Sequence, residues 1–214
     1  MSEQMETEEI FKEVAFVPID LPPFEFGDTI YKTFSAEMNY GWWEAVRLFA
    51  ENPTFAAITE WSETAKKNYE PLMNYIVNFL PYDSFIHAKL MKAKVPAPPH
   101  LDFRFPEKHP EVYQMTQKYE PAAYRIVIHG SRRGKLFLCN KETSDPQNYI
   151  FPELPMDTDV YAMPYTNQYH GTFFEPDRLI VIVQGYLNPQ KHLELLKKSL
   201  KRYKNYVVYK KDLV

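Results

Sequence analysis

The sequence predicts a mainly β domain with flanking helices, and three features indicate this class. Aromatic residues make up 16% of the 214 residues, 18 prolines stand against 6 glycines, and short β-prone runs fill the second half of the chain. Tyr, Phe and β-branched residues favour strands, whereas proline interrupts helices and suits turns and sheet edges. A series of short strands separated by proline-rich and polar turns is typical of an all-β sandwich or barrel.

The second half of the chain contains most of the predicted strands. They cover residues 84–95, 123–130, 134–140, 159–165 and 177–187. A turn at Gly130–Gly134 joins the second strand to the third, and the last strand is a nearly continuous apolar run, which predicts burial. Residues 108–121 interrupt the series and are expected to hold a short helix. Residues 189–203 have the leucine spacing of an amphipathic helix.

The first 80 residues differ from the rest. Residues 1–14 are polar and acidic, and the proline-rich residues 16–26 are expected to form an extended segment on the domain. Between Ser35 and Phe79 the apolar spacing favours helices: one around residues 42–49, then 55–61 and 69–79. We therefore expect one domain, with an N-terminal extension and helices over 1–80, a β core over 81–188, and a closing helix and tail over 189–214.

Composition and charge limit the partners. A net charge of −3 supplies no basic field, so nucleic-acid binding has no general electrostatic support. The single cysteine, Cys139, cannot form an internal disulfide, which suits a reducing compartment. No apolar run approaches the roughly 20 residues that span a bilayer, and the acidic N-terminus lacks the pattern of a signal peptide. The sequence therefore favours a cytoplasmic protein that does not bind membranes.

Three candidate metal ligands occur in the β region. His100 and Asp102 follow a proline-rich turn, and in an extended chain residues i and i+2 point to the same side. His170 follows about 70 residues later. Two imidazoles and one carboxylate on one face of an octahedron leave three positions open for a cosubstrate and O₂, an arrangement that suits iron(II).

Arg178 adds a cosubstrate to this prediction. It lies eight residues beyond His170, at the head of the buried apolar strand. A buried arginine needs an anionic partner, and a dicarboxylate such as 2-oxoglutarate supplies one by bidentate pairing. The alternative for each residue is structural: His100 in a surface turn, His170 capping a strand, and Arg178 paired with Asp177 or Glu175.

These motifs resemble those of the Fe(II)- and 2-oxoglutarate-dependent oxygenases, in particular the aspartyl/asparaginyl β-hydroxylase-like branch. The resemblance covers PHLD (99–102), YRIVIHGSRRGKLFLCN (124–140) and MPYTNQYHGTFFEPDRLIVIVQGYLNP (163–189). It implies a double-stranded β-helix, which is a jelly-roll or cupin-like core. Residues 1–80 have no such resemblance.

The resemblance also implies the roles of the residues. His100, Asp102 and His170 would bind the iron, and Arg178 would hold the distal carboxylate of 2-oxoglutarate. Arg125 and Lys89 resemble residues that contact the cosubstrate, although a one-residue shift in register would turn either side chain to the opposite face. Asp102 matters because mammalian members of this branch lack that carboxylate. If Asp102 occupies the third ligand position on the iron, no position is left for a halide, which favours hydroxylation or desaturation over halogenation.

The implied activity is the oxidation of a small polar substrate, such as an amino acid or an amino-acid side chain, by O₂, with release of succinate and CO₂. Two alternatives remain open. A cupin-type metal dioxygenase would need no 2-oxoglutarate and would leave Arg178 without this role. A non-catalytic jelly-roll binding protein would keep the fold alone.

Overall fold

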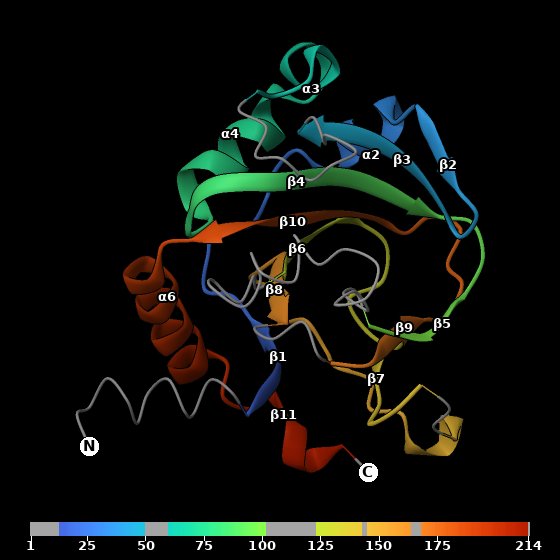
Figure 1. Ribbon diagram of the computed structural model, residues 1–214, viewed down its shortest axis with the longest axis vertical. Coiled ribbons are helices and arrows are strands. Elements are labelled where there is room, and N and C mark those ends of the chain that lie inside the picture. The colour runs from blue at the N-terminus through green and yellow to red at the C-terminus, as the bar shows by residue number, and fades with distance from the viewer. Residues whose placement is uncertain (1–12, 50–59, 102–122, 143–144, 164–167, 214) are drawn as a thin grey trace, which may run out of the picture.

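Two antiparallel sheets of unequal size form the core of the protein. The computed structural model describes residues 13–49, 60–101, 123–142, 145–163 and 168–213. The larger sheet has the strand order β11-β1-β8-β6-β10-β4-β3-β2, and the smaller one the order β5-β9-β7 (Figure 1). The strands of the larger sheet are β1 (Val14–Pro18), β2 (Met38–Tyr40), β3 (Trp43–Phe49), β4 (Tyr82–Ala93), β6 (Ala123–His129), β8 (Val160–Met163), β10 (Leu179–Leu187) and β11 (Val208–Tyr209).

The smaller sheet consists of β5 (Ala97–His100), β7 (Leu136–Leu138) and β9 (His170–Thr172). An apolar cluster that includes Phe16, Leu138 and Tyr161 joins residues of the larger sheet to residues of β7. The architecture is therefore mainly β with a jelly-roll core, as the sequence predicts.

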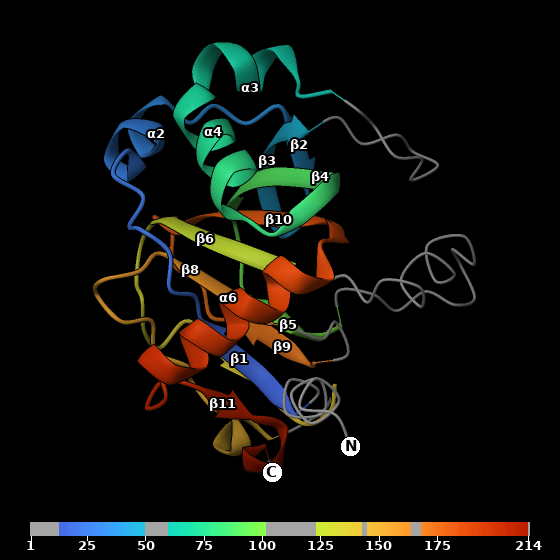
Figure 2. The same ribbon diagram turned by 90° about the vertical axis from the view of Figure 1, so that its left-hand side faces the viewer.

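Helices cover the opposite side of the larger sheet. They are α2 (Gly27–Thr33), α3 (Glu63–Asn68), α4 (Glu70–Phe79) and α6 (Pro189–Arg202), with short 3₁₀ turns at Pro146–Asn148 and Lys210–Asp212. In Figure 1, α3 and α4 lie above β4, and Figure 2 shows α6 lying along the sheet beside β6 and β8. Leu72, Ile76 and Leu196 of these helices are buried in the main apolar core. None of the helices in the described ranges is long and apolar enough to cross a membrane.

The register of the larger sheet separates its two faces. Residues directly opposite each other in antiparallel strands point to the same face, and successive residues along a strand point to opposite faces. One row, which packs into the main core with the helices, runs through Val46, Leu90, Val181, Ile126 and Val160. The adjacent row therefore points toward the smaller sheet, and runs through Arg47, Lys89, Ile182, Arg125 and Tyr161.

The helix predicted around residues 42–49 is wrong, because this segment is a strand. Strands β2 and β3 form a hairpin in which Tyr40 lies opposite Trp43, with Gly41 and Trp42 between them. Gly41 has a φ of 54°, the left-handed conformation that glycine adopts without strain and that two-residue hairpin turns require. The alternation of Ala45 and Arg47 with Val46 and Leu48 is a period of two, which the neighbouring tryptophans obscure in the sequence.

The other predicted elements agree with the structure at their centres. The five predicted strands correspond to β4, β6, β7, β8 and β10, and the helices over 69–79 and 189–203 correspond to α4 and α6. The proline-rich turn before His100 is instead the strand β5, which lies at the edge of the smaller sheet among the described residues, a position where proline is tolerated. The short helix expected over 108–121 and most of the segment 55–61 lie outside the described residues. The single-domain division remains a prediction.

Candidate metal centre

The smaller sheet brings His100 and His170 together. Strands β5 and β9 are antiparallel, and His100 lies directly opposite His170, so both side chains leave the same face of the sheet. The two ring centroids are 4.5 Å apart. His170 is buried, with 4% of its surface exposed, and His100 is half-buried beside the ring of Trp42. Two histidines 70 positions apart in the sequence thus form one site.

The hydrogen bonds of both histidines select the same tautomer. His100 Nδ1 lies 2.8 Å from the carbonyl oxygen of Pro98, and His170 Nδ1 lies 3.0 Å from that of Gln168. Because a carbonyl oxygen only accepts, each Nδ1 carries the proton and each Nε2 keeps its lone pair. A backbone carbonyl that fixes one ring nitrogen in this way is the usual outer support of a metal-binding histidine.

Gln168 holds the segment that leads into β9. Its side-chain amide donates hydrogen bonds to the carbonyl oxygens of Cys139, at 2.8 Å, and Tyr169, at 2.9 Å. The side chain is buried, so these bonds satisfy an amide that would otherwise be costly to desolvate. Gln168 therefore positions both its own carbonyl group and the imidazole of His170 that donates to it.

The third predicted ligand, Asp102, lies outside the described residues. Within those residues, no group of three or more His, Cys, Asp or Glu side chains is arranged to hold a metal ion. The described part of the site thus consists of two imidazoles, and Asp102 would follow His100 by two positions. Its role as a ligand remains a prediction.

Arg125 faces His170 from the larger sheet. It is buried on β6, and its Nη2 lies 3.3 Å from His170 Nε2. A guanidinium has no acceptor, so Nε2 accepts this hydrogen bond, in agreement with the tautomer that the Gln168 carbonyl selects. One lone pair serves either the arginine or a metal ion, and a metal at Nε2 would therefore replace this hydrogen bond.

Arg178 is buried on the same side of the sheet. It immediately precedes β10, is 3% exposed, and its Nη2 lies 3.5 Å from the hydroxyl oxygen of Tyr161. The guanidinium also lies 5.9 Å from the ring centroid of Trp43. Within the described part of the chain, its Nη1 is buried and has no hydrogen-bond partner. A buried guanidinium in this condition carries a large desolvation cost, which an anion would offset.

The neighbouring carboxylates are engaged elsewhere. Asp177 accepts a hydrogen bond from the hydroxyl group of Tyr31 at 2.6 Å. One carboxylate oxygen of Glu175 accepts from both the backbone N–H and the hydroxyl group of Ser131. A side-chain ion pair of Arg178 with Asp177 or Glu175, which the sequence left open, is not found among the described residues, and the backbone N–H of Arg178 donates to the backbone carbonyl oxygen of Glu175.

Tyr161 connects the two buried arginines. The guanidinium of Arg125 lies 5.9 Å from the centroid of its ring, while its hydroxyl group faces Arg178. A series of contacts therefore runs from His170 through Arg125 and Tyr161 to Arg178. Tyr161 has no distinguishing signal in the sequence, because only the pairing of β8 with β6 places it opposite Arg125.

Lys89 lies on the same face as Arg125. Both are opposite Ile182 of β10, one from each neighbouring strand. Arg47 lies opposite Lys89 on β3 and joins the same row. Sequence reasoning missed Arg47, because it treated residues 42–49 as helical.

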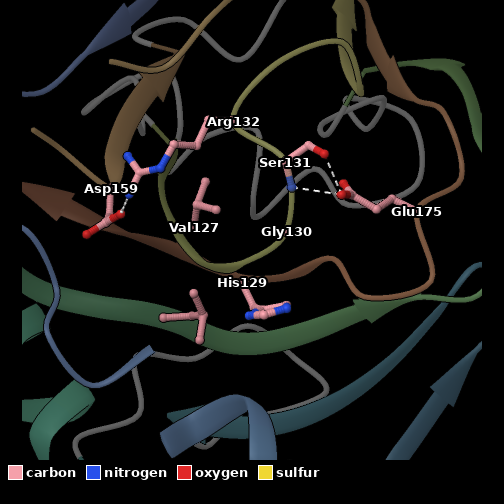
Figure 3. Close-up of a pocket in the computed structure, with 8 residues that line it drawn as sticks. Val127, His129, Gly130, Ser131, Arg132, Asp159 and Glu175 are labelled. Atoms are coloured by element: carbon pink, nitrogen blue, oxygen red, sulfur yellow. Dashed lines mark hydrogen bonds and ion pairs between the residues drawn. The ribbon is translucent and has the colours of Figure 1, made fainter. Parts of the chain in front are cut away.

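The basic turn that follows β6 forms the wall of an open cavity of about 460 Å³ (Figure 3), and Ser131 and Arg132 of this turn also line a smaller pocket with Tyr161 and Arg178. Arg132 pairs with the buried carboxylate of Asp159 and also donates to the carbonyl oxygens of Pro155 and Thr158. Arg133 lies 3.7 Å from a carboxylate oxygen of Glu153. The charges of this turn therefore stabilise the surrounding loops.

Comparisons with known proteins agree with the fold. No family model matches the sequence, and no curated protein matches it. A 2OG-Fe(II) oxygenase family oxidoreductase from Burkholderia pseudomallei is similar in structure, with a TM-score of 0.52, 8% identity, and coverage of 86% of this chain and 89% of that chain. AviO1 from Streptomyces viridochromogenes has a TM-score of 0.39, with 13% identity and coverage of 88% and 96%. Hazelnut vicilin has a TM-score of 0.33, with 7% identity and coverage of 73% and 33%. Of these three, only the first exceeds 0.5, and at its low identity it shows a shared fold.

Proposed function

We propose that this protein is an Fe(II)- and 2-oxoglutarate-dependent oxygenase. One observation carries the proposal: a jelly-roll core brings together two histidines whose Nδ1 atoms both donate to backbone carbonyl oxygens, and it buries Arg125 and Arg178 on the face of the larger sheet that points toward them. The similarity to the fold of a 2OG-Fe(II) oxygenase family protein supports it. The resemblance of the sequence motifs suggests the aspartyl/asparaginyl β-hydroxylase-like branch, with a small polar or amino-acid-like substrate.

The residues present suit both groups. Neutral imidazole nitrogens bind iron(II), and an added carboxylate from Asp102 would complete the facial set of three ligands. The Nη1 of Arg178 lacks a hydrogen-bond partner among the described residues, and a carboxylate would accept from it. When bound, iron(II) and 2-oxoglutarate would supply the oxidising chemistry with O₂, releasing succinate and CO₂.

The side chains of this chain would have separate tasks in such a reaction. His100, His170 and Asp102 would hold the metal, and Arg178 would fix one end of the cosubstrate. A metal ion bound to His170 Nε2 would replace the hydrogen bond from Arg125. The guanidinium of Arg125 would then be able to pair with anionic groups near the metal. The apolar residues of the two facing sheets would limit the access of water to the site, which strengthens these charged contacts.

A binding experiment under anaerobic conditions tests the proposal. Fe(II) is titrated into the full-length protein by calorimetry, and 2-oxoglutarate is then added while the visible absorption of the chelate is followed. We expect His170→Ala to lose metal binding, and Arg178→Met to bind the metal but to weaken 2-oxoglutarate binding at least tenfold. His129→Ala is the matched control and should change neither affinity, because this histidine stacks on Tyr31 and lies opposite Leu179, whose side chain is buried in the main core.

Two results would contradict the proposal in different ways. Unchanged metal binding by His170→Ala would show that the predicted ligands are wrong. Metal binding without any 2-oxoglutarate binding would instead favour the cupin-type dioxygenase, which needs no cosubstrate.

A further inference from the structure

A pair of basic residues lies opposite each other on the interior face of the larger sheet. Arg47 of β3 is directly across from Lys89 of β4 in an antiparallel pair. Their Cα atoms are therefore about 4.5–5.5 Å apart, and both side chains leave the same face. Like charges in directly opposed positions destabilise a sheet. Both residues are half-buried.

The guanidinium of Arg47 is poorly satisfied. Within the described part of the chain, its Nε is buried and makes no hydrogen bond, and its Nη2 lies 3.4 Å from the thioether sulfur of Met38. A thioether is a weak acceptor, whereas a guanidinium presents a planar set of donors that match a carboxylate or a phosphate. The geometry therefore suits an oxyanion that receives hydrogen bonds from Arg47 and lies beside Lys89.

Along the strand direction of the larger sheet, Arg47 and Lys89 lie at a different position from Arg178. The backbone N–H of Ala93 donates to the carbonyl oxygen of Arg178 at 3.3 Å, so Arg178 is level with the end of β4. Lys89 lies four residues earlier on that strand, about 13 Å away at 3.3 Å per residue. Arg178 can hold one end of a cosubstrate while Arg47 and Lys89 face a second ligand.

The same row continues toward the histidines. Arg47 and Arg125 are separated by three strand spacings, about 14 Å, and Arg125 contacts His170. Long side chains at both ends shorten the distance that a ligand must span. A small molecule held at Arg47 and Lys89 could therefore extend toward the two histidines.

We propose that Arg47 and Lys89 bind the anionic group of the substrate, and that this substrate is a small molecule carrying a carboxylate or a phosphate. The proposal rests on the oxygenase function proposed above, since it assigns a substrate class to that site. Arg47 and Lys89 determine specificity: they select and orient the substrate.

The test uses inorganic phosphate and malonate as probes on the full-length protein. Each probe is titrated by calorimetry with Fe(II) and saturating 2-oxoglutarate under anaerobic conditions, and again without either, so that competition at Arg178 is recognised. We expect at least one probe to bind the wild-type protein, and the one that binds shows whether the site prefers carboxylate or phosphate. Arg47→Gln should weaken that binding at least tenfold. Lys201→Gln is the control and should bind the probe as the wild type does, because this exposed residue belongs to α6 on the opposite side of the larger sheet.

The melting temperature provides a second readout, because loss of an arginine with a purely structural role would lower it. Without a probe, Arg47→Gln should melt within a few degrees of the wild type, because the buried Nε of Arg47 makes no hydrogen bond among the described residues that the substitution would remove. If this variant does not fold, Arg47→Lys keeps the charge but loses the planar fork and should also bind the probe at least tenfold more weakly. Wild-type affinity in Arg47→Gln or Arg47→Lys, or no binding of either probe to the wild type, would overturn the proposal.

The two proposals fail separately. Probe binding that depends on Arg47, in a protein that binds neither iron nor 2-oxoglutarate, would refute the oxygenase function and leave an anion-binding jelly roll. Iron and 2-oxoglutarate binding without probe binding would refute the anionic substrate alone.

Discussion

Gly130 should be far less tolerant of alanine than Gly134, although both have a positive φ. Gly130 has a φ of +103°, and a Cβ built there would lie 2.9 Å from the Cα of Arg178. Gly134, at the other end of the same turn, has a φ of +74° and no atom within 4 Å of such a Cβ. The pair therefore separates backbone strain from the close approach to Arg178.

The expected magnitudes follow from these two terms. Alanine at position 134 meets strain alone, which costs about 1–2 kcal/mol for an L-residue in the left-handed region. At position 130 strain of about 1–3 kcal/mol is joined by a backbone contact that only movement of the chain relieves. We expect Gly130→Ala to lower the free energy of unfolding by about 3–4 kcal/mol, roughly 2 kcal/mol more than Gly134→Ala.

Urea unfolding followed by tryptophan fluorescence measures this difference. Movement of the Arg178 backbone should also reduce 2-oxoglutarate affinity in Gly130→Ala, while Gly134→Ala should keep the affinity of the wild type. Equal destabilisation by the two substitutions, within about 0.5 kcal/mol, would refute the reasoning, because it would mean that the contact with Arg178 carries no cost.

Three further predictions concern single side chains. Burial lowers the pKa of His192 from 6.5 to about 4, so in this range the unfolded chain binds a proton that the folded chain does not. Acidification from pH 6.5 to 4 should therefore reduce the free energy of unfolding by up to about 3 kcal/mol more in the wild type than in His192→Gln, and parallel pH curves would contradict this. Asp159 accepts hydrogen bonds from the backbone of Phe24 and from Arg132. Asp159→Asn should therefore lower the free energy of unfolding, measured in urea, by about 2–4 kcal/mol, and a decrease below about 0.5 kcal/mol would contradict this stabilising role. Tyr161→Phe removes a long hydrogen bond to Arg178 and should weaken 2-oxoglutarate binding by about two- to fivefold in calorimetry, with little change in the free energy of unfolding. An unchanged affinity would exclude Tyr161 from the proposed cosubstrate site.

Much of the fold was accessible from the sequence because its signals are local. The apolar run before Asn188 predicts β10, and the leucine spacing of residues 193–200 predicts α6. The failure at Trp43–Phe49 has an equally local cause. A short apolar segment is compatible with both the helical period of 3.6 and the strand period of two. Its assignment as a strand depends on pairing with β4 and on the turn at Gly41.

The order of His100, His170 and Arg178 in the sequence determined which residue types are available for a metal and an anion. The tertiary structure decided where they lie: the register of β5 with β9 places the two histidines on one face, and Arg178 is buried at the start of β10. It also decided that Arg47, Lys89 and Arg125 share a row, because strand register arises from contacts between segments distant in the chain. The sequence specifies the type of each side chain directly, but the face to which the side chain points depends on which strands pair and in which register.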